Sequence, residues 1–117
     1  MASTDFAVFL QPGSVERILQ PPVSYSFRRI PESVDPTGTT IWSLYKEVTW
    51  NWQTITDAEL SNIKSAIQAD GTITFRTEND NGAMVQCVGK TDRYPAVARY
   101  RGQVVDFSIT FSLVVEV

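Results

Sequence analysis

The side chains that most often carry out catalysis are scarce in this sequence. It contains no histidine, which removes the commonest general base and the imidazole ligands of metal sites. Cys87 is the single cysteine, so no intramolecular disulfide can form. With no histidine to activate it, we expect Cys87 to be a small core residue and not a nucleophile. The sequence also has no glycine-rich phosphate loop, zinc-ligand spacing or nucleophile elbow.

The carboxylates give no stronger sign of chemistry. Glu78 and Asp80 flank a predicted turn and could touch a calcium ion, but their spacing is not that of a calcium loop. Turn chemistry explains Asp80 without any ligand. We therefore predict that the protein is not an enzyme and that it has no catalytic residue, no cofactor and no metal site.

The charge balance argues against binding of nucleic acid through its phosphates. The formal net charge is −3, from 10 basic and 13 acidic residues, whereas such binding needs a concentrated basic surface. The few basic groupings are expected to be solvated strand faces or partners in salt bridges. These groupings are Arg28 with Arg29, and Arg93, Arg99 and Arg101.

The aromatic residues allow two interpretations. Exposed rings could stack on sugars, as in carbohydrate-binding modules, and the candidates are Trp42, Trp50, Trp52, Tyr45, Tyr94 and Tyr100. The three tryptophans, however, share one parity along a predicted strand, beside a predicted amphipathic helix. This pattern favours a core role, and we predict that Trp42, Trp50 and Trp52 are buried.

These residues must be positioned by a scaffold that is mainly β. A length of 117 residues with 43% hydrophobic residues suits one soluble domain over residues 1–117. Alternating patterns and breakers predict strands near residues 6–10, 23–30, 41–55, 72–77, 83–89 and 96–101. Residues 79–82 (NDNG) predict a hairpin turn. Residues 31–40 (PESVDPTGTT) predict a loop, whereas residues 14–19 are ambiguous.

One helix is predicted over residues 57–69. Thr56 and Glu59 have the spacing of a capping box, and Ile55 and Leu60 that of a hydrophobic staple. Leu60, Ile63 and Ile67 would form an apolar stripe that lies on a sheet. Gly71 is expected to close the helix in a left-handed conformation.

The last segment, residues 103–117, predicts a long strand. The alternate residues Val105, Phe107, Ile109, Phe111, Leu113, Val115 and Val117 are expected inside, with Phe107 and Phe111 as core aromatics. The opposite row includes Asp106, Ser108, Thr110, Ser112 and Glu116. Such a row is either a solvated sheet face or a surface that continues into a neighbouring copy. Exposed strand edges normally need protection, and the chain has only three lysines to provide it: Lys46, Lys64 and Lys90.

No apolar run approaches the length that spans a membrane. The first residues carry no basic segment and no small-residue cleavage site, so we expect no signal peptide. The single cysteine fits synthesis in a reducing cytoplasm.

The order of features resembles the small tail proteins of long-tailed bacteriophages and prophages, of the tail tube, distal tail and tail hub kind. The resemblance covers residues 48–117. It consists of a strand with Trp50-Asn51-Trp52, a capped helix, the strand Gly71-Thr72-Ile73-Thr74-Phe75, the pair Val88-Gly89 and the closing alternating strand.

The resemblance implies an antiparallel β-sandwich or barrel-like tube fold with a flanking helix. It also implies a virion structural protein, made in the host bacterial cytoplasm, that forms homo-oligomeric rings (a hexamer is one option) and contacts other phage tail proteins. DNA would pass through the lumen as non-specific cargo, and an acidic, hydroxyl-rich lining would let it slide. Asp106, Ser108, Thr110, Ser112 and Glu116 are the candidates for the lumen or for a face between subunits.

Two loops would then be candidates for contacts between rings. Residues 31–40, with Val34, Asp35, Pro36, Thr37 and Gly38 at their centre, form the candidate assembly loop, and residues 91–95 form the second. The alternative function is a carbohydrate-binding β-sandwich module of a tail tip or a secreted protein.

Overall fold

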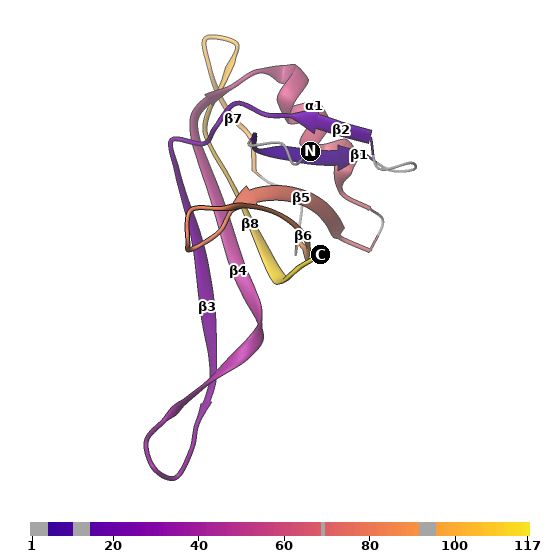
Figure 1. Cartoon of the computed structure of the whole chain (residues 1–117). Helices are drawn as coiled ribbons and strands as arrows, with labels where there is room; N and C mark the ends of the chain where they lie inside the picture. The colour runs from indigo at the N-terminus through magenta and orange to yellow at the C-terminus, as the bar shows by residue number, and fades with distance from the viewer. Residues whose placement is uncertain (1–4, 11–14, 69, 92–95) are drawn as a thin grey trace.

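The computed structural model describes residues 5–10, 15–68, 70–91 and 96–117. The chain is mainly antiparallel β-sheet with a single helix in this part, as the sequence predicted (Figure 1). The elements in chain order are β1 (Ala7–Leu10), β2 (Val15–Ile18), β3 (Ser24–Val34), β4 (Thr40–Ile55), α1 (Asp57–Ala66), β5 (Thr72–Glu78), β6 (Met84–Lys90), β7 (Ala98–Tyr100) and β8 (Gln103–Glu116).

The strands form one open sheet in the order β2-β1-β5-β6-β8-β4-β3, and β7 pairs with β8 beside this path. The sheet folds on itself, because β8 pairs with β4 along most of its length and with β6 near its end. Its two halves share one hydrophobic core: Trp50 of β4 meets Phe75 of β5 edge to face, and Phe75 stacks on Phe111 of β8 with ring centres 4.1 Å apart. The two halves of this open sheet therefore pack against each other across the core.

The core holds most of the aromatic residues that the alternation placed there. Trp50, Trp52, Phe107 and Phe111 are all buried. The indole N–H of Trp52 donates to the backbone oxygen of Gln20 at 3.0 Å. A tryptophan buried in this way keeps its polar atom satisfied.

Strand β8 alternates as expected only in its middle part. Phe107, Ile109 and Phe111 are buried there. At the start of β8 the core position belongs to Val104, and the alternation changes across Asp106, which has a φ of 49°. The valines that the sequence placed inside are therefore only partly buried or exposed: Val105, Val115 and Val117.

The prediction that Leu113 lies in the core is wrong. Leu113 is 52% exposed, and Val114 is fully buried in its place. Lys46 pairs with Val114 while Val48 pairs with Phe111, so β8 contains one more residue than β4 between these pairs. This is a β-bulge, with Leu113 in the left-handed region at a φ of 52°. An inserted residue reverses the facing of every later side chain, and here it turns the end of β8 toward β6.

Helix α1 begins where it was predicted to begin. The Thr56 hydroxyl accepts from the Glu59 amide at 3.2 Å, and the Glu59 carboxylate accepts from the Thr56 amide at 3.5 Å. The helix buries Leu60, Ile63 and Ala66, and its nearest strand is β1.

The helix is shorter than predicted, because it ends at Ala66 and Ile67 is already extended. Gly71 lies beyond it, in the turn before β5, with a φ of 81°. A Cβ at Gly71 would lie 2.7 Å from the backbone oxygen of Thr91, so a residue with a side chain would clash at this position. Residue 69, where we expected the helix to end, lies outside the described residues.

Three further segments can be compared with what the sequence predicted. The ambiguous residues 14–19 contain β2, an exposed edge strand. Residues 79–83 form the predicted hairpin turn, in which the Asn79 side chain accepts from the amides of Asn81 and Ala83. Half of residues 31–40 belongs to strands, so only residues 35–39 form a loop. No helix in the described ranges is long and apolar enough to cross a membrane.

Candidate assembly surfaces

The far halves of β3 and β4 form a long hairpin that projects from the rest of the molecule (Figure 1). We call residues 30–45 the arm. The chain is elongated as a result, with extents of 55 × 33 × 29 Å. The candidate assembly loop therefore lies at the tip of this arm, and the loop that the sequence predicted is in fact two strands joined by a tight turn.

One side chain organises the turn at the tip. The carboxylate of Asp35 accepts from the Thr37 amide at 3.0 Å, the Thr37 hydroxyl at 2.7 Å and the Thr39 amide at 2.9 Å. The hydrogen bond from the Thr37 hydroxyl is the main cause of the lowered pKa of Asp35. Gly38 has a φ of 86°, a conformation that glycine adopts without strain.

The arm carries large apolar side chains that the chain itself does not cover. The prediction that Trp42 lies in the core is wrong, because its side chain is 52% exposed and Leu44 is 76% exposed. The physical reason is that β4 pairs with β8 only from Lys46 onward and has buried side chains only from Val48 onward, so the arm extends past the core. The exposed apolar residues of the arm are Val34, Ile41, Trp42, Leu44 and Tyr45. Of these, Trp42 and Leu44 lie two residues apart on β4 and share one side of the strand. Exposed apolar patches mark interaction sites.

The base of the arm is tied to the body by polar contacts. Arg29 lies 3.7 Å from Asp80 in the turn between β5 and β6, and Arg28 lies 3.7 Å from Glu47 across the hairpin. A hydrogen bond with Glu78 of β5 is the main cause of the raised pKa of Tyr25. Glu78 and Asp80, the candidates for a calcium contact, thus pair with β3 instead.

The polar row predicted on β8 is part of a wider face that spans three strands. Thr110 pairs with Thr49 of β4, and their hydroxyl oxygens lie 3.2 Å apart. Thr49 pairs in turn with Ser26 of β3. The next rung repeats the pattern, and there the Asn51 amide donates to the Ser24 hydroxyl at 3.2 Å. We call this surface the hydroxyl face: Ser24, Ser26, Thr49, Asn51, Ser108 and Thr110.

The five residues of the predicted row do not all lie on one face of the sheet. Asp106 is exposed, two residues before Ser108 in the sequence. Ser112 is half-buried, and its hydroxyl donates to the backbone oxygen of Lys90 at 3.3 Å. Glu116 lies beyond the Leu113 bulge, opposite Cys87 of β6. Ser112 and Glu116 therefore belong to the junction with β6 and not to the hydroxyl face.

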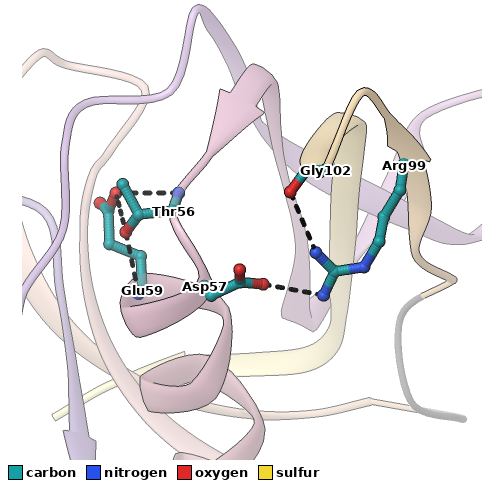
Figure 2. Close-up of polar contacts among 5 residues, drawn as sticks. All are labelled: Thr56, Asp57, Glu59, Arg99 and Gly102. Atoms are coloured by element: carbon teal, nitrogen blue, oxygen red, sulfur yellow. Dashed lines mark hydrogen bonds and ion pairs between the residues drawn. The ribbon is translucent and has the colours of Figure 1, made fainter.

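A groove lies between α1 and β7, at the end of the molecule opposite the arm tip (Figure 1). Its volume is about 500 Å³, and it is lined by Asp57, Leu60, Ser61, Lys64, Ser65 and Arg99. Arg99 donates to Asp57 at 2.8 Å and to the Gly102 backbone oxygen at 3.5 Å (Figure 2). The Arg99 hydrogen bond is the main cause of the lowered pKa of Asp57, and the Asp57 bond likewise raises the pKa of Arg99.

Cys87 lies in the core, where burial raises the pKa of its thiol to about 12. A thiol protonated at neutral pH is a poor nucleophile. Among the described residues, no group of three or more cysteine, aspartate or glutamate side chains is placed to hold a metal ion.

No sequence pattern indicated some of the functional candidates, and other candidates lie outside the described residues. The lining of the groove includes a contact between Asp57 and Arg99, which are 42 residues apart in the sequence. No local sequence pattern indicates such a contact. The hydroxyl face could have been inferred from matching alternation in three strands, but their order in the sheet was unknown. Arg93, Tyr94 and most of the second candidate loop fall within residues 92–95, outside the described residues.

Comparison with protein-family models, with curated proteins and with solved structures finds no match to this chain.

Proposed function

We propose that this chain is a non-enzymatic structural protein that self-assembles into rings and forms part of a bacteriophage tail, as a tube, distal tail or connector component. The observation that carries the proposal is the arm. A hairpin that projects from a small domain and exposes Trp42 and Leu44 leaves apolar surface in water. Covering that surface with a neighbouring copy would stabilise the assembled state.

The hydroxyl face supports the same proposal. Its hydroxyl and amide groups lie on β3, β4 and β8, on the side of the sheet opposite the buried Trp50 and Phe111. The hydroxyl and amide groups themselves offer no cationic partner to phosphate, and Asp106 adds negative charge near the end of the row. Arg28, at the next rung on the same side of β3, lies 3.7 Å from Glu47, which balances its charge. In a ring, such a face suits a lumen through which DNA passes without being held.

The test is the assembly state of the full chain, measured by light scattering after size exclusion and by electron microscopy. Rings or tubes at high protein concentration are expected. The double variant Trp42→Ser/Leu44→Ser should remain folded but monomeric. Val23→Ser is the matched control, since Val23 is also exposed but lies off the arm, and it should assemble normally. A wild-type monomer at every concentration would contradict the proposal.

The second candidate is a carbohydrate-binding module, favoured by the exposed ring of Trp42 on the arm. Trp50 and Trp52 are buried and are unable to stack on a sugar. Binding of a glycan would change the Trp42 fluorescence, and Trp42→Ala would abolish it. A glycan screen in which wild type and Trp42→Ala behave identically would exclude this candidate.

A further inference from the structure

The arm tip is acidic. Between residues 31 and 45, the only charged residues are Glu32 and Asp35. Asp35 is ionised at neutral pH, as an exposed aspartate ordinarily is, and the hydrogen bond from the Thr37 hydroxyl lowers its pKa further. Its three hydrogen bonds within the turn also fix the shape of the tip before any partner is met. A preorganised segment loses little conformational entropy on docking.

The groove between α1 and β7 has the opposite charge. Its charged lining consists of Lys64, Arg99 and Asp57. The Asp57 carboxylate is already held by Arg99 at 2.8 Å, which leaves Lys64 as the unbalanced charge. Ser61 and Ser65 flank Lys64 on the helix surface and are exposed. Their hydroxyls can donate to the carbonyl or carboxylate oxygens of an incoming segment.

The size of the groove fits a short peptide segment. Its volume of about 500 Å³ lies within the roughly 300–1,000 Å³ of typical ligand sites. Leu60 borders the groove but is only 5% exposed, because it belongs to the core. The accessible lining therefore combines two hydroxyls and a net positive charge.

The arm tip and the groove lie at opposite ends of the long axis (Figure 1). The tip therefore does not reach the groove of its own chain, whereas in a head-to-tail arrangement the tip of one copy meets the groove of the next. Contacts of this heterologous kind repeat from copy to copy and give a ring or a filament.

We propose that the arm tip of one copy docks into the α1–β7 groove of the next copy, with the tip carboxylates facing Lys64. This inference rests on the proposed self-assembly and adds to it the two surfaces that meet. The second copy is the occupant because the same chain supplies both an acidic tip and a basic groove. Attraction between them also predicts that assembly weakens as salt rises.

A charge-reversal series on the full chain tests the pairing. Glu32→Lys and Lys64→Glu should each raise the concentration needed for assembly by about tenfold, because each places like charges at the contact. The double variant restores an opposite pair and should recover to within about threefold of wild type. Both side chains are exposed, so melting temperatures should stay within about 3 °C of wild type.

Lys90→Glu is the matched control. It makes the same charge change at an exposed lysine of β6, away from the groove lining, and it should assemble as wild type does. Sedimentation velocity at about 50 and 500 mM salt, where screening differs strongly, gives the second measurement.

The possible failures are distinguishable. Wild-type rings together with normal assembly of both single variants would overturn the groove assignment alone. A defect in Lys64→Glu but not in Glu32→Lys would mean that another segment occupies the groove, and failure of the double variant to recover would also overturn the pairing. A wild-type chain that never assembles would overturn this inference together with the proposed function.

Discussion

The indole nitrogen of Trp50 lies 2.9 Å from the hydroxyl oxygen of Thr77, and both side chains are fully buried. Trp50 belongs to β4 and Thr77 to β5, so this hydrogen bond joins the two halves of the folded sheet across the core. Trp50 also contacts Phe75 and Phe111 edge to face. The orientation of one ring is thus fixed by one hydrogen bond and by its aromatic neighbours.

Thr77→Val should destabilise the fold by about 1–3 kcal/mol, because it leaves the buried indole N–H without an acceptor. The free energy of unfolding from urea denaturation, followed by tryptophan fluorescence, measures the change. Thr77→Ser keeps the hydroxyl acceptor and should lower the free energy of unfolding by less than Thr77→Val does. Equal losses in the two variants would mean that packing, and not the hydrogen bond, dominates at this position.

The ion pair between Asp57 and Arg99 should make stability fall in acid. The folded state holds the pKa of Asp57 below its ordinary 3.8, mainly through the Arg99 hydrogen bond. Its contribution is therefore present above about pH 3.8 and is lost as the pH falls through the folded-state pKa. The coupling energy from Asp57→Asn, Arg99→Gln and the double variant should be favourable at pH 7 and should shrink toward zero in acid. A coupling energy that does not change with pH would contradict this assignment.

Arg101→Asn should stabilise the protein by about 1 kcal/mol. Arg101 and Gly102 join β7 to β8 with φ values of 52° and 80°, as the two central residues of a type I′ turn require. Most L-residues pay roughly 1–2 kcal/mol for the left-handed conformation, whereas asparagine tolerates it. The melting temperature measures the gain, with the exposed Gln103→Asn as control. A lower melting temperature would show that the Arg101 contact with the Tyr100 ring matters more.

Gly89→Ala should destabilise the fold by about 1–3 kcal/mol through overpacking. A Cβ at Gly89 would lie 2.9 Å from a methyl group of Val114 and 3.2 Å from the backbone oxygen of Ser112. Both neighbours belong to the bulge that turns β8 toward β6. Denaturation midpoints check the prediction, and Gln86→Ala, at an exposed position of the same strand, should have little effect.

Cys87 should resist thiol reagents in the folded protein. Burial raises the pKa of its thiol to about 12, so at pH 8 only about 0.01% would be thiolate. Modification should therefore be slow until denaturant unfolds the chain. Rapid labelling under native conditions would show that the β6 region opens locally.

The sequence by itself determined the elements whose signals are local. The capping box of Thr56 and Glu59 placed the start of α1, and Asn79 and Gly82 placed the hairpin turn. The strict alternation of Phe107, Ile109 and Phe111 identified the middle of β8 and its buried side. Each of these depends on residues a few positions apart, so the chain carries the information without its tertiary neighbours.

Only the tertiary structure decided what covers each strand and where a strand bends. Trp42 and Trp50 share a parity, yet Trp50 is buried and Trp42 is exposed, because the pairing of β4 with β8 begins only at Lys46 and the arm extends past the core. Leu113 leaves the core because β8 bulges where it passes from β4 to β6. Parity records which side of a strand a residue faces, while burial depends on distant segments packing against that side.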